Sequence, residues 1–125
     1  MIKFNTEKAL LLQELIINQT GGTTGVRDMG LLDAALSSAY QTFGGTEFYP
    51  TVEEKAAKIG SNLVANHAFV DGNKRIGLLI MLTFLEVNDV ELSCTDQELV
   101  ELGLGLASGQ IKYEHLLDWI LKHKV

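Results

Sequence analysis

The polar groups of this sequence that can do chemistry are concentrated between His67 and Arg75, a segment that reads His-Ala-Phe-Val-Asp-Gly-Asn-Lys-Arg. Histidine has an ordinary pKa near 6.5, so His67 can accept a proton from a hydroxyl group at neutral pH. Asp71 offers the hard oxygen atoms that Mg²⁺ prefers, usually together with the phosphates of a substrate. These two residues therefore indicate a site that works on a phosphate-containing molecule.

The residues that follow Asp71 are suited to holding an anion. Gly72 and Asn73 lead into a helix that we expect to begin near Asn73. The first N–H groups of a helix have no internal partner, and the helix dipole places partial positive charge there. Lys74 and Arg75 add two full charges, and arginine can grip a phosphate through two hydrogen bonds. A general base, a metal ligand and a phosphate-binding turn together predict phosphoryl transfer.

Each of these residues also has a simpler explanation. Asp71 or Asn73 could cap the helix that follows. Asp71 and Arg75 are four residues apart, which is the spacing of a weak ion pair on a helix surface. His67 could be a hydrogen-bonded histidine at a helix end. The hypothesis therefore depends on the whole segment, in which we expect Phe69 to be a core residue that fixes its polar neighbours.

Helical periodicity between glycine-rich breaks predicts the elements that position the segment. Thr51 with Glu54 and Thr95 with Glu98 form capping-box patterns that start two of the helices. The helix after Gly72 is apolar almost all round, which is typical of a buried central helix. We expect an all-α bundle of about six helices around this helix. The helices are expected at residues 6–18, 28–42, 51–66, 73–85, from 95 onward and 113–122, with a small hairpin at Gly44-Gly45 and Phe48-Tyr49.

Composition limits the class of protein. The chain has 125 residues, 46% of them hydrophobic, and 16 acidic against 10 basic side chains give a net charge of −6. This length predicts one domain over residues 1–125. A single cysteine, Cys94, excludes a disulfide framework and fits a reducing, cytoplasmic setting, and the first residues show no signal-peptide layout. No apolar run is long enough for a membrane helix, and the acidic balance argues against direct binding of nucleic acid.

The segment from His67 to Arg75 resembles the signature His-x-Phe-x-Asp/Glu-Gly-Asn-x-Arg of the Fic/Doc superfamily. Other parts of the chain are similar to the death-on-curing (Doc-type) toxins of type II toxin-antitoxin systems within it. These parts are the loop 21–25, the pair Ala34-Ala35, the segment 44–50, the run 54–57 and Asn66 before His67. The resemblance implies the all-helical Fic/Doc fold, with a flap that pairs with the target protein.

The sequence differs from the adenylylating members at two positions. Lys74 replaces a glycine, and Leu78 replaces a second arginine that contacts the γ-phosphate of ATP. Doc-type toxins share this Lys-Arg form. The resemblance therefore implies transfer of the γ-phosphoryl group of ATP to a threonine of elongation factor Tu, which inhibits translation. The nucleotide is then bound in reverse to its orientation in adenylylating enzymes.

The resemblance also implies a role for each residue. His67 is the base for the target hydroxyl and Asp71 the Mg²⁺ ligand, and the phosphates are bound by Gly72, Asn73, Lys74 and Arg75. The flap corresponds to Phe43, Gly44, Gly45, Thr46, Glu47, Phe48 and Tyr49. A strand added to an exposed edge is one way to bind a target, but an ordinary glycine-rich loop would explain this segment equally well.

Doc-type toxins are neutralised by a cognate antitoxin. Self-inhibited Fic proteins carry a Ser/Thr-x-x-x-Glu helix, and no serine or threonine here is followed four residues later by glutamate. Inhibition would then come from a partner. The alternatives are AMP transfer to a protein hydroxyl, a non-catalytic antitoxin-binding co-repressor, and an RNA-cleaving toxin, against which the acidic balance argues. The sequence leaves open a homo-oligomer, the target and the antitoxin-binding groove.

Overall fold

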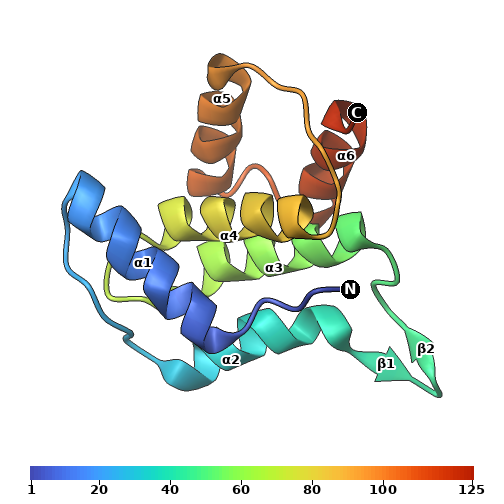
Figure 1. Ribbon diagram of the computed structural model, residues 1–125, viewed down its shortest axis with the longest axis horizontal. Coiled ribbons are helices and arrows are strands. Elements are labelled where there is room, and N and C mark those ends of the chain that lie inside the picture. Colours follow the sequence, from blue (N-terminus) through green and yellow to red (C-terminus); the bar gives the residue numbers. More distant parts are fainter.

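The chain folds as six α-helices with one short hairpin, which confirms the predicted all-α class (Figure 1). The computed structural model describes all residues, 1–125. A 3-10 turn, η1 (Ser38–Tyr40), follows the second helix. The elements are α1 (Thr6–Thr20), α2 (Met29–Ser37), β1 (Thr42–Phe43), β2 (Thr46–Glu47), α3 (Val52–Asn66), α4 (Asn73–Val87), α5 (Asp96–Ala107) and α6 (Tyr113–His123).

Local capping sets most of the helix starts. Both predicted capping boxes form, so that the Thr51 hydroxyl accepts from the Glu54 N–H at the start of α3 and Thr95 does the same for α5. The Asp28 carboxylate accepts from the Leu31 N–H at 3.0 Å and caps α2. The second helix ends earlier than predicted, at Ser37, because the chain tightens into the 3-10 turn before the hairpin.

Two antiparallel helices, α3 and α4, share the centre of the bundle (Figure 1). The prediction placed α4 alone there, but α3 packs against α2, α4, α5 and α6. Small side chains allow this, since Ala56, Ala57 and Gly60 are fully or almost fully buried. A Cβ atom on Gly60 would lie only 3.2 Å from the Cβ of Met81 on α4. The centre therefore depends on close helix approach as much as on large apolar side chains.

The hairpin lies beyond the N-terminal end of α3, whereas His67 follows its C-terminal end (Figure 1). Its strands pair Thr42 with Glu47 and Phe43 with Thr46, so they begin earlier than the predicted Phe48-Tyr49 strand. The buried Lys55 side chain, only 1% exposed, anchors it to α3. The Lys55 ammonium group donates to the Glu47 carboxylate at 2.9 Å and to the Tyr49 carbonyl. A buried lysine is stable here because its charge is paired.

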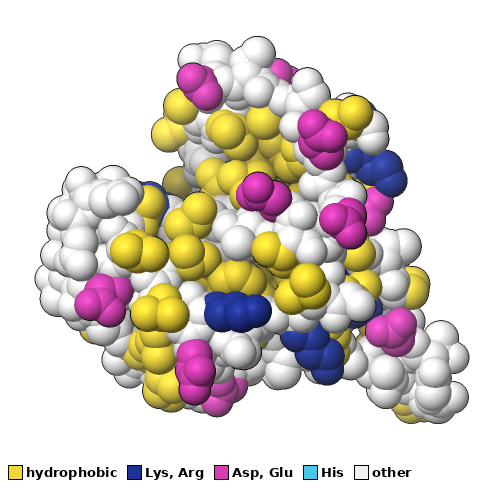
Figure 2. Space-filling view, viewed as in Figure 1, with side chains coloured by type: hydrophobic (Ala, Val, Ile, Leu, Met, Phe, Trp, Pro, Cys, Tyr) yellow, Lys and Arg dark blue, Asp and Glu magenta, His cyan; other side chains and the backbone are white.

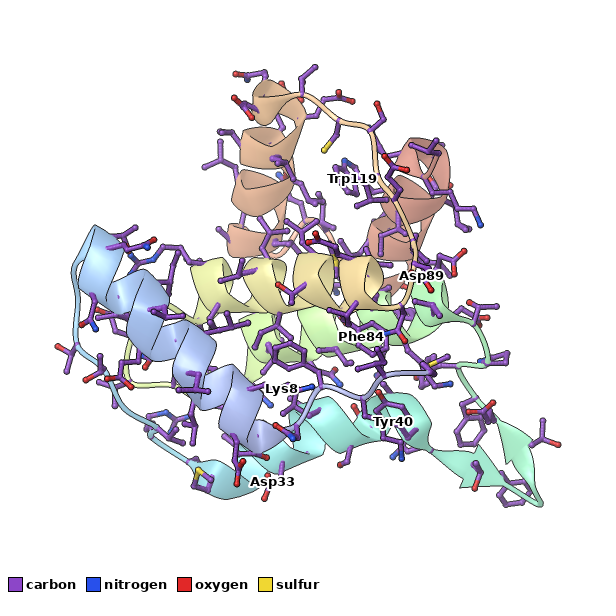
Figure 3. All side chains as sticks on the ribbon, viewed as in Figure 1. Lys8, Asp33, Tyr40, Phe84, Asp89 and Trp119 are labelled. Atoms are coloured by element: carbon purple, nitrogen blue, oxygen red, sulfur yellow. The ribbon has the colours of Figure 1, made fainter.

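The visible face of the molecule is apolar where α1, α4 and α5 meet (Figure 2). On α1, the exposed Leu11 and Leu15 side chains line a shallow apolar hollow of this face together with Phe4, Leu12 and Thr83. Lys8 lies beside these side chains on α1 (Figure 3). None of the helices combines the length and the apolar character needed to cross a membrane.

The last helix is attached to α5 through His123. Trp119 points into the space between α5 and α6 and stacks on the His123 ring, with centroids 4.2 Å apart (Figure 3). Nδ1 of His123 is 2.7 Å from the Trp119 carbonyl, and Nε2 is 2.6 Å from the Glu98 carboxylate. These two acceptors, the carbonyl first, raise the pKa of His123, while the Thr95 N–H and then His123 lower the pKa of Glu98. The geometry therefore favours an imidazolium ring that donates from both nitrogens.

We predict a pH-dependent contribution from His123 to stability. Because its pKa in the folded chain lies above the ordinary 6.5, the contribution is complete below that pH and is lost as the pH rises through the raised pKa. Glu98, with its lowered pKa, keeps its charge down to below its ordinary 4.5. We expect His123→Gln to lower the melting temperature clearly at about pH 6 and less at about pH 9.

The exposed His115 on the same helix provides the control, because its ring accepts only from the Lys112 N–H at 3.4 Å, an acceptor role that a glutamine oxygen can fill, so His115→Gln should lower the melting temperature little. An equal loss for His123→Gln at both pH values would show that the ring acts only by packing.

Candidate functional site

His67 is placed by the end of α3. It is the C-cap residue and has left-handed backbone angles, φ 53° and ψ 45°. A non-glycine residue in this region is strained by about 1 kcal/mol or more and persists only where its surroundings hold it. No protein group forms a hydrogen bond with its imidazole, and the residue is exposed. Both ring nitrogens are therefore open to a group that approaches from the solvent side.

Arg27, in the loop between α1 and α2, holds the His67 backbone. Its Nε donates to the His67 carbonyl at 2.8 Å and its Nη2 to the Asn66 carbonyl at 3.3 Å. These carbonyls end α3 and have no partner inside the helix. Backbone hydrogen bonds also join this loop to the residue after His67, because the N–H groups of Arg27 and Asp28 both donate to the Ala68 carbonyl. Arg27 thus caps α3 and fixes the strained residue.

Phe69 and Asn73 close the loop that follows. Phe69 is 1% exposed, as predicted for an anchor, and pairs with Val26 in an isolated antiparallel bridge. Its N–H donates to Asn73 Oδ1 at 2.9 Å, and Asn73 Nδ2 donates to its carbonyl at 3.0 Å. The Asn73 side chain is therefore used inside the loop. Its backbone N–H and the second hydrogen of Nδ2 have no partner in the fold and can donate to an anion.

Asp71 faces the loop between α1 and α2. Its two carboxylate oxygens accept from the Gly72 N–H at 2.8 Å and from the Thr23 N–H at 3.3 Å. Gly22 permits this approach, since a Cβ atom there would lie 2.5 Å from Asp71 Oδ2 and its φ is +118°. Buried Gln13 on α1 fixes both sides by donating to the carbonyls of Thr23 and Asp71.

The surroundings of Asp71 fit a magnesium ion that is shared with a phosphate-containing substrate. No group of three or more His, Cys, Asp or Glu side chains is arranged so that it could hold a metal ion by itself. Mg²⁺ needs no such cluster, because one carboxylate with substrate phosphates and water is a usual ligand set. Each oxygen of Asp71 accepts a single hydrogen bond and keeps a lone pair for a cation.

The start of α4 is open. Its N-cap is Gly72, with φ 77°, and no side chain caps the first N–H groups. The fold therefore contains neither a side-chain cap of α4 by Asp71 or Asn73 nor an ion pair between Asp71 and Arg75. These simpler explanations are wrong. The exposed Arg75 donates to the Thr20 hydroxyl and to the Gly21 carbonyl at the end of α1.

One cavity of about 400 Å³ brings the predicted residues together. It is lined by His67, Val70, Asp71, Gly72, Asn73, Lys74 and Arg75. The predicted flap, residues 43–49, does not reach it, because the 15-residue α3 lies between them and a helix of that length spans about 22 Å. A second cavity of about 570 Å³ shares His67 and Lys74 with the first and lies against the turn between α5 and α6.

Comparison with known proteins agrees with this arrangement. The family described as Fic/DOC matches residues 3–85, which is well over half of the chain and includes the whole loop between α3 and α4. The chain belongs to the Fic/Doc family. A protein named Toxin Doc, from Mycolicibacterium smegmatis, is 47% identical over 73 residues, which are 58% of this chain and 56% of that protein. The match thus spans little more than half the length of that relative.

In this Fic/Doc chain, the sequence prediction missed three residues that support the site: Gln13, Gly22 and Arg27. Gln13 is 2% exposed on the buried face of α1, and a polar residue at such a position signals a buried hydrogen-bond partner. Gly22 and Arg27 lie in a glycine-rich loop, where nothing in the local sequence indicates which backbone they approach. Their partners lie about 40 or more residues further along the chain.

We predict that Arg27→Ala loosens the Fic/Doc signature loop. Two helix-terminal carbonyls lose their charged donor, which should lower the free energy of unfolding by about 1 kcal/mol. Amide exchange at Phe69 and Val70 should become faster than in the wild-type chain, as measured by mass spectrometry after hydrogen-deuterium exchange. Arg27→Lys keeps the charge but not the fork of two donors, so an intermediate rate is expected. Unchanged exchange in Arg27→Ala would show that the backbone bridge alone holds the loop.

Proposed function

We propose that this chain is a Doc-type toxin that transfers the γ-phosphoryl group of ATP to a Ser or Thr hydroxyl of a protein. One observation carries the proposal. The unpaired imidazole of His67, the carboxylate of Asp71 and the uncapped N-terminus of α4 line the same cavity of about 400 Å³. A base beside an anion-binding helix end is the arrangement that phosphoryl transfer needs.

The proposed reaction needs only positioning and charge neutralisation from the protein. His67 takes the proton of the target hydroxyl, and that oxygen forms a bond to the γ-phosphorus. The bond from this phosphorus to the β–γ bridging oxygen breaks, and ADP leaves with the electron pair. The N–H groups at the start of α4, with Lys74 and Arg75, neutralise the phosphate oxygens. Mg²⁺ held at Asp71 would neutralise the remaining negative charge.

The residues around the α4 N-terminus favour phosphate over AMP as the transferred group. Lys74 is exposed at the helix start, where a glycine would leave space. Leu78 follows one turn later and is only partly buried, so no second arginine reaches a terminal phosphate. With the γ-phosphate beside His67, the rest of the nucleotide extends along the cavity at the α4 N-terminus.

AMP transfer remains the second candidate because of the larger cavity. About 570 Å³ beside His67 and Lys74 is enough for a nucleoside. A nucleoside there would place the α-phosphate, rather than the γ-phosphate, next to His67. The two activities therefore differ in which cavity holds the adenine ring of ATP.

The biological role is proposed from the similarity to the protein named Toxin Doc. We propose elongation factor Tu as the target, with inhibition of translation as the outcome. We also propose a cognate antitoxin, since the chain lacks the Ser/Thr-x-x-x-Glu pattern of self-inhibited relatives. Inhibition then comes from a separate protein.

Labelled ATP tests the reaction. With Mg²⁺ and γ-labelled ATP, elongation factor Tu should acquire label and gain one phosphate by intact mass. His67→Ala should reduce the initial rate by about 10²- to 10⁴-fold, because the general base is lost. His115→Ala is the control, since this exposed histidine lies on α6 and lines neither cavity.

If elongation factor Tu acquires label from α-labelled ATP but not from γ-labelled ATP, the transferred group is AMP and the proposed phosphate transfer is wrong. Equal rates for His67→Ala and the wild-type chain would show that His67 is not the general base of the reaction.

A further inference from the structure

The larger cavity has an unusual charge for this protein. Its 14 lining residues include three lysines, Lys58, Lys74 and Lys112, and no carboxylate. The whole chain carries a net charge of −6. Positive charge is thus gathered in this cavity although the chain as a whole is negative, which indicates an anionic occupant. The lining also contains apolar groups, among them Val64, Leu106 and Ile111, so the occupant must present apolar atoms as well.

The cavity runs along one face of α3. Lys58, Ser61, Asn62 and Ala65 line it at a helical spacing of three and four residues, and His67 lines it at the end of the helix. This face of α3 extends over about 13 Å from Lys58 to His67, given the rise of an α-helix. An extended segment of about four residues would cover that length.

The end of the cavity that is remote from His67 meets the base of the hairpin. The Lys58 ammonium group lies 5.4 Å from the centre of the Tyr49 ring, and Tyr113, which lines the cavity, has its ring centre 5.3 Å from that of Tyr49. Lys55 holds this end of the hairpin on α3. The cavity therefore connects the exposed hairpin with His67, although the hairpin itself lies one helix length from the site.

The proposed reaction leaves this cavity without a nucleotide. When the γ-phosphate lies beside His67, the remainder of ATP occupies the cavity at the α4 N-terminus. The target hydroxyl must then approach His67 from another direction, and the residues that flank it need a place to lie. The larger cavity is continuous with His67 and is lined by lysines that would attract carboxylates.

We infer that this cavity binds an acidic segment of the target protein, which flanks the hydroxyl that is phosphorylated. The inference rests on the proposed phosphoryl transfer. Lys58 and Lys112 select the acidic side chains, Lys74 lies between the segment and the phosphates, and the apolar lining contacts the rest of the segment. Partly exposed lysines act as point charges here, so they contribute specificity by attracting acidic and repelling basic segments.

Binding, rather than turnover, gives the sharpest test. The probe is a fluorescein-labelled peptide with one threonine between glutamates, titrated with the full chain in the presence of Mg²⁺ and a non-hydrolysable ATP analogue. Lys58→Glu and Lys112→Glu, alone and together, are compared with Lys8→Glu, which makes the same charge change on α1 outside the cavity. A second peptide has lysines in place of the glutamates. Thermal melting verifies that each variant is folded.

We expect the double variant to weaken binding of the acidic peptide by about tenfold or more and to strengthen binding of the basic peptide, because two charges are reversed. Lys8→Glu should leave both affinities unchanged, and all variants should bind the nucleotide analogue as the wild-type chain does. Equal affinity of the wild-type chain for both peptides would overturn the inference. So would a large loss of nucleotide affinity in the double variant with peptide binding unchanged, since the cavity would then hold the nucleoside.

The test separates this inference from the proposed function. Lysine-dependent binding of the acidic peptide without phosphate transfer to any protein would support the cavity assignment and reject the activity. Phosphate transfer to elongation factor Tu with charge-independent peptide binding would support the activity and reject the cavity assignment.

Discussion

The attachment of the loop between α3 and α4 to the loop between α1 and α2 is the constraint on which the site depends. His67 is held in a left-handed conformation that a histidine does not favour by itself. Arg27 binds its carbonyl, and Val26 pairs with Phe69 two residues later. Gln13 then ties both loops to α1. Because these contacts fix the backbone, the imidazole needs no hydrogen bond of its own and stays available to a substrate.

A single helix, α3, connects the separate parts of the proposed machinery. Its C-terminal end carries His67, one of its faces lines the larger cavity, and its N-terminal part anchors the hairpin through Lys55. Small residues on its other faces let α2, α4 and α6 pack closely around it. A well-packed central helix is hardly compressible, so the distance between the hairpin and His67 is set by helix geometry.

Charge is distributed in this protein so that its anionic surface contrasts with a cationic site. The net charge of −6 is opposed locally by Lys74 and Arg75, by the dipole of α4 and by the two further lysines of the larger cavity. The same field would attract a nucleotide and an acidic polypeptide while the rest of the surface repels both. Lys74, which lines both cavities, is the point where the two anions would meet. In the proposed function, phosphate transfer and AMP transfer would differ in which of the two cavities holds the nucleotide.

The sequence alone determined most of the helices and grouped the candidate site residues in one segment, because both features are encoded locally. Thr51 and Thr95 start helices through bonds to residues three positions away, and the signature places His67, Asp71, Lys74 and Arg75 within nine residues. Only the tertiary structure decided what supports and surrounds them. Arg27 reaches a carbonyl 40 residues away, and the cavity gathers lysines from α3, α4 and the start of α6. These contacts depend on how the helices pack against one another. The local sequence around Arg27 or the lysines does not show which distant residue each of them will meet.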